Sequence, residues 1–305
     1  GPYIATNAAG VDAWGVSATI DYEINDNFSI KSITGYREYD TLSGMDNDNS
    51  PVVFIQSTDW FQHEQFSQEL RFTGNVVNNT VHFTVGGIYY DAATRPLSRI
   101  HTPFSGFGPT GFPTFSFLND DTADMKVLAG FANVAWDITS ALTLETGFRL
   151  TDEQKDYTFG RLNPDGRGDY LPLSNPNNQL TGWTGTYSDT VDDYRVALSY
   201  KLRSDSMVYG QFATGHKAGG ISPRPYSYHQ IRPFGAELLD SYEVGFKTDL
   251  FGRTLRLNGS VFYMDYKGYQ GIPNVCVGTD GQPLPADQGG TPGLCGQYLN
   301  LADAT

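Results

Sequence analysis

Hydrophobic and polar residues alternate along most of this chain, which is the pattern of β-strands with one apolar and one polar face. The pattern is clearest over residues 191–202, where Tyr194, Val196 and Leu198 alternate with polar or small neighbours. Further strands are expected at residues 16–24, 28–44, 66–72, 81–89, 125–137, 142–157, 207–213, 242–250 and 255–260, with a last one, cut short, at 297–304. Residues 93–121 show no strand period. The pattern therefore predicts an all-β protein.

The connections between these segments alternate between two lengths. Short turns are expected near residues 25–27, 75–79, 139–141, 203–206 and 251–253, and long loops at 45–59, 93–121, 158–190, 214–241 and 271–296. Outer-membrane barrels keep short turns on the periplasmic side and long loops outside, so the alternation favours an antiparallel transmembrane β-barrel over a soluble sandwich. Ten or eleven strands with open edges would leave backbone groups unsatisfied in lipid. We therefore expect further strands beyond Thr305, before Gly1, or both.

Composition narrows the class of protein without naming it. The hydrophobic fraction of 39% and the mean hydropathy of -0.37 would suit a soluble protein, but 19 Tyr and 19 Phe also fit the aromatic girdles of a membrane barrel. No run approaches the roughly 20 apolar residues that a membrane-spanning helix needs. A formal charge of -14 argues against a nucleic-acid partner. Gly1 begins no signal peptide, so either one has been removed or the chain is a piece of something longer.

Four stretches, in this order and spacing, carry a resemblance to a known family. They are KSITGYR at residues 31–37, QFSQELRF at 65–72, GHKAGG at 215–220 and the segment 237–247 with its core SYEVGFK; YLNLADA at 298–304 looks like the next strand. Together they resemble the barrel of TonB-dependent outer-membrane receptors of the iron-complex type, found in Gram-negative bacteria. Two departures are His216, where the family usually has an aromatic, and Gly235-Ala236, where a proline is common.

The resemblance implies a fold and a function. The family's barrel has about 22 strands around a plug, so residues 1–305 would be the N-terminal half of one barrel domain, with the plug and the C-terminal strands absent from this chain. The implied activity is uptake of a scarce ligand, most often a ferric siderophore, across the outer membrane of a Gram-negative bacterium. The implied partners are outer-membrane lipid, the protein's own plug, and the TonB energy-transducing complex acting through the plug. A ferric complex would be cargo, and no covalently bound cofactor is expected.

Two other classes of function remain open from the sequence. A passive porin or adhesin barrel would have no plug, and a soluble carbohydrate-binding or glycosidase β-domain would leave the membrane without detergent. Within the family, relatives carry haem, cobalamin or oligosaccharides, and the loops that decide the ligand are the least transferable part. The ligand is therefore not named by the sequence.

Charged residues recur on the polar side of the expected strands. In a receptor barrel they would line the lumen and hydrogen-bond the plug, whereas on a soluble sheet they would face water. The residues predicted to face the plug are Arg37, Glu69, Arg71, Glu145, Arg149, Arg195, Glu243, Lys247 and Arg256.

Two long loops are rich in residues that suit ligand contact. Rigid aromatic faces offer contact area at small entropic cost, and Tyr with Arg suits an anionic, aromatic ligand. The alternative is packing of loop on loop, since aromatic clusters are usually core. The candidates are His101, Phe104, Phe107, Phe112 and Phe115 in the first loop and Arg224, Tyr226, Tyr228, His229 and Arg232 in the second.

The remaining candidate motifs favour one disulfide and argue against a metal site and a catalytic site. Cys276 and Cys295 are the only cysteines and lie in one external loop, which favours a disulfide over free thiols or a redox pair. The acidic segment from Asp46 begins like a calcium loop, but Pro51 and Ser57 occupy places that need Gly and Glu. The histidines lack metal-ligand spacing, and no G-x-S-x-G places a nucleophile. We therefore expect no metal site and no catalytic site.

Overall fold

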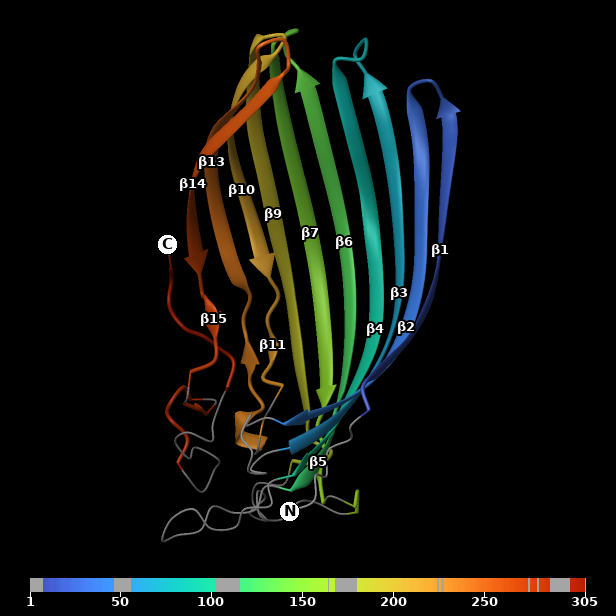
Figure 1. Cartoon of the computed structure of the whole chain (residues 1–305), viewed down its shortest axis with the longest axis vertical. Helices are drawn as coiled ribbons and strands as arrows, with labels where there is room; N and C mark the ends of the chain where they lie inside the picture. Colours follow the sequence, from blue (N-terminus) through green and yellow to red (C-terminus); the bar gives the residue numbers. More distant parts are fainter. Residues whose placement is uncertain are drawn as a thin grey trace.

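The computed structural model describes residues 8–46, 56–101, 116–163, 165–167, 180–223, 225, 228–273, 275–278, 280–285 and 297–304. Most of them form one large, curved antiparallel sheet (Figure 1). Each long strand pairs with the next long strand along the chain, as in an up-and-down meander. In spatial order these strands are β1 (Gly10–Asn25), β2 (Phe28–Asp46), β3 (Gln56–Val76), β4 (Val81–His101), β6 (Thr122–Asp137), β7 (Leu142–Thr158), β9 (Thr184–Arg203), β10 (Ser206–Lys217), β13 (Glu237–Leu250) and β14 (Leu255–Lys267).

The short elements gather at the end of the sheet opposite the tight turns (Figure 1). β5 (Phe117–Asp120) pairs with β4, and β8 (Arg161–Leu162) pairs with β5. Two separate ribbons are formed by β11 (Gly220–Ile221) with β12 (Pro233–Phe234), and by β15 (Gln270–Gly271) with β16 (Leu299–Asn300). A 3-10 turn, η1, covers Tyr228–Gln230. No helix among the described residues is long and apolar enough to cross a membrane.

The predicted short turns are confirmed, and local chemistry explains them. The Asn25 side chain accepts hydrogen bonds from the backbone N–H of Asn27 at 2.9 Å and of Phe28 at 3.1 Å, which closes the first turn. Asn78 and Asn79 adopt positive φ in the second turn, a conformation that Asn tolerates better than most residues. Gly252 adopts positive φ in the last turn, between β13 and β14. The long connections leave and rejoin the sheet at its other end.

Several strands run further than the alternation predicts. β3 already begins at Gln56, β4 continues to His101, and β9 starts at Thr184, all within segments interpreted as loops. The predicted absence of strand at 93–121 was also wrong for β5. Where both faces of a strand are polar, the hydrophobic period vanishes while backbone pairing continues. The expected last strand, 297–304, is reduced to β16 and a bridge between Tyr266 and Ala304.

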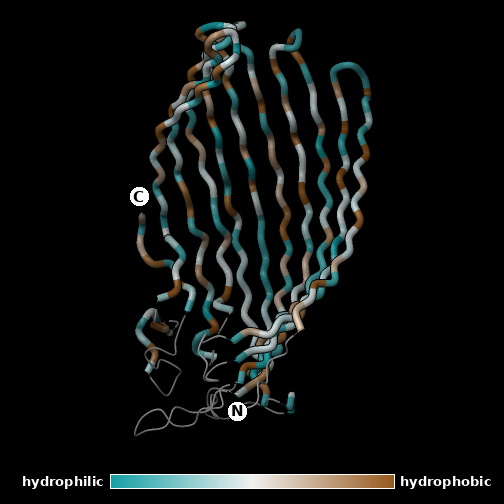
Figure 2. Tube along the Cα trace, in the orientation of Figure 1, coloured by the Kyte–Doolittle hydropathy of each residue, from teal (hydrophilic) through white to brown (hydrophobic). Residues whose placement is uncertain are grey.

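The sheet is apolar on one face and polar on the other. Directly opposed residues of an antiparallel pair share a face, and the register groups Leu198, Val196 and Tyr194 with the other exposed apolar side chains. The alternate residues, such as Ala197 and Ser199, are less exposed. Curvature crowds the concave side, so the polar face is the concave one and the apolar face is convex. Figure 2 shows hydrophilic and hydrophobic positions alternating along the strands. This is the reverse of a water-soluble protein.

An arginine placed on the convex face tests this assignment. In lipid vesicles, Leu198→Arg is expected to destabilise the full-length protein by about 2–4 kcal/mol, because the side chain would enter hydrocarbon near the centre of the apolar band. The matched control is Ser199→Arg on the concave face, which is expected to cost far less. Denaturant unfolding midpoints measure both. Equal destabilisation by the two variants would contradict the assignment of faces.

Candidate functional site: the concave wall and its loop end

The register places the predicted plug-facing residues together on the concave face. Arg195 lies opposite Gly147, and the neighbouring concave pair is Glu145 with Ala197. The same face continues through Gln211 to Glu243. On this face lie Arg37, Glu69, Arg71, Glu145, Arg149, Arg195, Glu243, Lys247 and Arg256. Their shared face follows from the alternation alone, whereas contact with a plug stays a prediction.

Most of these charges have partners within the wall. Arg195 forms an ion pair with Glu145 at 2.7 Å, in which both side chains stay nearly half exposed. Glu243 accepts hydrogen bonds from Gln211 at 2.9 Å and from Tyr209 at 2.5 Å. The other pairs are Arg71 with Glu69, Arg149 with Thr151, Arg256 with Asp249, and Lys247 over the ring of Tyr209. The concave face is thus a polar, solvated wall with its charges largely matched.

The clusters of buried hydrophobic residues in the described chain lie at the loop end of the sheet. Phe159, Leu180 and Ile221 are almost completely buried in one cluster, and Tyr228 packs against it. Trp183 stacks on Tyr228 with ring centroids 4.7 Å apart and planes 14° apart, while its own side chain is 47% exposed. These residues come from the segments after β7 and after β10, so the cluster fixes two long connections to each other. It leaves one aromatic face, that of Trp183, accessible.

A buried ion pair joins the segment between β5 and β6 to β8 at the loop end. Asp121, between β5 and β6, contacts the guanidinium of Arg161 in β8 at 2.5 Å and accepts the N–H of Gly160 at 3.0 Å. Burial raises the pKa of Asp121, and the nearby Arg161 charge opposes that rise. The Nε of Arg161 has no hydrogen-bond partner among the described residues. The pair is therefore sensitive to the loss of either member.

The stretch Gly215–Gly220, which carried part of the resemblance, is held against the concave wall. Lys155 donates to the carbonyl of Gly219 at 2.8 Å, and the Tyr187 hydroxyl accepts the N–H of Gly219 at 3.1 Å. Burial raises the pKa of Tyr187 to about 12. His216 is 2.8 Å from the Asp193 carboxylate. The alternation placed Asp193 on a strand, but nothing in sequence spacing pairs residues from segments this far apart.

The predicted ligand residues fall into two groups. Phe104, Phe107, Phe112, Phe115, Arg224 and Tyr226 lie outside the described residues. Of the remaining four, His101 is the last residue of β4 and its ring nitrogen is 3.1 Å from Ser116. Tyr228 belongs to the apolar cluster next to His229, and Arg232 donates to the carbonyl of Gly278 at 2.6 Å. These contacts organise the loops, and ligand contact stays a prediction for all of the candidates.

The structure describes one of the two cysteines that were predicted to form a disulfide. Cys276 is buried, is disulfide-bonded, and lies 3.4 Å from the Gln230 side-chain amide. Cys295, its predicted partner, lies outside the described residues, so the pairing itself stays a prediction. Most of the acidic segment that begins at Asp46 also lies outside them. Within the described part of the chain, no group of His, Cys, Asp and Glu is arranged to hold a metal ion.

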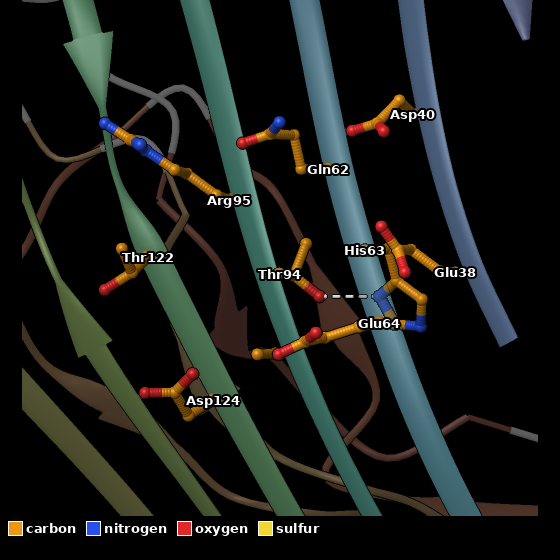
Figure 3. A pocket seen from close by; sticks show the side chains of 10 residues that line it. Glu38, Asp40, Gln62, His63, Glu64, Thr94, Arg95, Thr122 and Asp124 are labelled. Carbon is orange, nitrogen blue, oxygen red and sulfur yellow. Dashed lines mark hydrogen bonds between the residues drawn. The ribbon is translucent and has the colours of Figure 1, made fainter. Parts of the chain in front are cut away.

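A polar cavity of about 310 Å³ lies between β2, β3, β4 and β6 (Figure 3). Acidic side chains line much of it, and His63 contacts Thr94 there at 2.8 Å. None of the predicted ligand residues is part of it. The labelled lining residues are Glu38, Asp40, Gln62, His63, Glu64, Thr94, Arg95, Thr122 and Asp124. Most of them lie on the convex face, beyond the end of the apolar band that is nearer the long loops.

Comparison with known proteins explains this architecture. A family model described as TonB-dependent receptor-like, β-barrel matches residues 1–305. The chain belongs to this family. TonB-dependent receptors are outer-membrane proteins of Gram-negative bacteria, which accounts for a sheet with an apolar convex face and a polar concave one. In the described chain the barrel is an open sheet that ends at β1 and β14.

Solved structures of low sequence identity share the fold. The ferric yersiniabactin uptake receptor FyuA from Yersinia pestis is 18% identical with a TM-score of 0.66, covering 88% of this chain and 38% of the receptor. The siderophore receptor PiuA from Acinetobacter baumannii is 16% identical with a TM-score of 0.64, covering 96% and 42%. The ferric-catecholate import receptor Fiu from Escherichia coli K12, in its closed form, is 16% identical with a TM-score of 0.58, covering 92% and 44%. The chain thus spans less than half the length of these receptors.

Removing Asp121 tests the anchoring of the loop end. Asp121→Ala is expected to destabilise the loop end locally by about 3–5 kcal/mol, because Arg161 would be left as an uncompensated buried charge. Hydrogen exchange of the amides in residues 117–120 and 159–162 measures this. The matched control is Asp120→Ala, whose partner Arg95 is half exposed and whose loss is expected to cost about 1 kcal/mol or less. Similar protection in both variants would show that the buried pair does not hold the loops.

Proposed function

We propose that this chain forms part of the wall of a TonB-dependent transporter that takes up a scarce ligand, most specifically an iron complex such as a ferric siderophore. The observation that carries the proposal is the concave face. Most of its charged side chains have a partner within the wall, either an opposite charge or a hydrogen-bonding or aromatic side chain, and remain solvated, as a wall that encloses a polar interior requires. The family membership supplies the second support, since receptors of this kind are transporters and not enzymes.

Capture would take place at the loop end of the wall. Trp183 exposes nearly half of its side chain there and is held in place by the stack on Tyr228. A fixed aromatic face binds a planar or aromatic ligand with little loss of conformational entropy. The anionic groups of a ferric complex would be matched by arginines of the loops, among which Arg224 and Arg232 are the sequence candidates.

Release inward would depend on the plug. The concave charges, with Arg195, Glu145 and Glu243 near the middle of the wall, offer hydrogen-bonding positions along the surface that a plug would fill. Because these charges already have partners within the wall, an ion pair for Arg195 with Glu145 and hydrogen bonds for Glu243, a plug surface could exchange partners with them at small electrostatic cost. Energy for the movement would come from the TonB complex through the plug.

The names of the similar structures favour an iron complex without deciding it. They include receptors for ferric yersiniabactin, ferric catecholate, ferric citrate and ferric preacinetobactin, but also a copper transporter, OprC. At 12–18% identity these structures support the fold, and the ligand rests on the chemistry of loops that differ most between relatives. A passive porin or adhesin barrel is the competing function.

Uptake by the full-length receptor separates these functions. Cells that express it under iron limitation are expected to accumulate radioactive iron from a panel of ferric siderophores, and accumulation is expected to stop when the proton gradient is collapsed. Binding that continues while accumulation stops would identify energised transport. Accumulation of small solutes that does not depend on the proton gradient would indicate a passive pore. Uptake of copper alone would contradict the proposal that the cargo is an iron complex.

Removal of the exposed aromatic face tests where the ligand is captured. Trp183→Ala is expected to weaken binding of the transported ferric complex about tenfold, because aromatic anchors at a binding surface are commonly worth 1–2 kcal/mol or more. Fluorescence quenching titrations on the purified receptor measure this. Trp136→Ala, on the convex face near a tight turn, is the matched control and is expected to bind normally. Unchanged affinity in the Trp183 variant would remove this surface from the ligand site.

A further inference from the structure

Two glutamine side chains are buried among the long connections at the loop end. Gln230 is 2% exposed and Gln297 is 1% exposed. They belong to different connections, because Gln230 ends the turn η1 after β10, whereas Gln297 lies two residues before β16. Burial of an amide side chain costs free energy unless its polar atoms find hydrogen bonds within the protein. Two buried glutamines on loops therefore indicate contacts that select one arrangement of those loops.

The two glutamines join the connection after β10 to the connection after β14. The side chain of Gln297 accepts the N–H of Val277 at 2.8 Å and donates to the carbonyl of Gln230 at 3.3 Å. The side-chain amide of Gln230 donates to the sulfur of Cys276 at 3.4 Å. These bonds cross between segments that are more than 40 residues apart in the chain. One small polar cluster thus holds η1 against the segment that contains Cys276.

The segment that contains Cys276 is itself restrained. Cys276 is disulfide-bonded and buried, and it packs against Leu284, whose N–H donates to the Cys276 carbonyl at 2.8 Å. A disulfide limits the arrangements that its loop can adopt. Arg232 adds a second tie just after η1, because its guanidinium donates to the carbonyl of Gly278 at 2.6 Å. The turn η1 is therefore attached at its C-terminal end to a covalently restrained segment.

The other end of η1 holds the exposed aromatic face. Tyr228, the first residue of η1, packs against the buried apolar cluster and stacks on Trp183 with ring centroids 4.7 Å apart. Ile231, just after η1, approaches β9 so closely that a Cβ on Gly185 would lie 2.8 Å from its side chain. The N–H of Ile231 donates to the Tyr228 carbonyl at 3.0 Å, which makes the turn one compact unit. This unit contacts the disulfide-bonded segment through Gln230 and the aromatic face through Tyr228.

We propose that Gln230 is a positioning residue for the aromatic face of Trp183. Its bond to Cys276 ties η1 to the disulfide-bonded segment, and η1 in turn holds Tyr228 under the indole ring. The inference rests on the proposed function for the role of Trp183 in ligand capture, whereas the tie itself does not depend on any ligand. A face that is fixed before the ligand arrives loses less conformational entropy on binding. Loosening of the tie is therefore expected to weaken capture and to leave the barrel folded.

Gln230→Ala tests the tie without a ligand. The variant keeps the backbone carbonyl that Gln297 binds and removes the amide that reaches Cys276. In the full-length receptor, hydrogen exchange in residues 180–185, as well as 228–232, is expected to become about three- to tenfold faster, the factor that loss of one hydrogen bond supplies. The N–H groups of Gly182 and Trp183 are hydrogen-bonded, so their exchange reports on the aromatic face. Acceleration confined to residues 228–232 would overturn the proposal.

The matched control is Gln282→Ala, the same substitution at an exposed side chain of the connection after β14. It is expected to leave exchange in residues 180–185 as in the wild type, and equal acceleration in the two variants would overturn the proposal. A heat-shifted band on a gel checks that each barrel is folded.

Removal of the disulfide tests the path from the other side. Cys276→Ser combined with Cys295→Ser is expected to accelerate exchange in residues 180–185 too. Addition of Gln230→Ala to this pair is expected to cause little further acceleration, because both changes act along one path. Fully additive effects would overturn the proposal.

Affinity links the tie to ligand capture. In fluorescence titrations with iron(III) tris(catecholate), Gln230→Ala is expected to bind about three- to tenfold more weakly than the wild type, the factor that ordering of one side chain commonly costs. In the background of Trp183→Ala the same substitution is expected to have no further effect, and an undiminished effect there would overturn the proposal. If Trp183→Ala alone binds as the wild type does, capture by Trp183 fails, and the exchange measurements still decide whether Gln230 holds the aromatic face.

Discussion

Backbone hydrogen bonding is the constraint from which the rest of this structure follows. In lipid, every N–H and C=O must find a partner within the protein, so strands can cross only as members of a continuous sheet. The chain meets this for the strands between β1 and β14 by pairing each long strand with the next through tight turns at one end, whereas β1 and β14 are the edges of the described sheet. Because each long strand pairs with the next one in sequence, the chain needs no crossover segments between strands. The long connections are then free to differ at the other end.

Once the sheet is fixed, its two faces take opposite environments. The period of two sends Leu198 and Val196 to the convex side and Arg195 and Ala197 to the concave side. Polar groups on the concave side satisfy one another, as in the pair of Arg195 with Glu145, so the wall needs no apolar core. In the part of the chain that the structure describes, buried clusters lie at the loop end, where Phe159 and the pair of Asp121 with Arg161 fix connections that backbone pairing does not reach. Transport and lipid contact are therefore assigned to separate surfaces of one thin wall.

The alternation was sufficient to predict the sheet, the tight turns and the shared face of the charged residues, because each of these depends only on near neighbours along the chain. Prediction of the strands failed where the alternation of apolar and polar residues ends. β3 at Gln56 and β4 at His101 extend beyond the apolar band, and there only the pairing partner reveals the strand. Contacts such as Lys155 with Gly219, or Trp183 with Tyr228, join segments far apart in sequence and carry no local signal.

The central claim is that one face of this sheet contacts lipid and the other faces the interior of the receptor. Nitroxide labels placed one at a time along residues 194–202 of the full-length receptor, in lipid vesicles, test it most directly. Collisions with oxygen, which concentrates in lipid, and with a water-soluble nickel complex are measured at each position. The account predicts a period of two, with labels at 194, 196, 198, 200 and 202 accessible to oxygen and the alternate labels shielded from it. A profile without this period, or high nickel accessibility at every position, would contradict it.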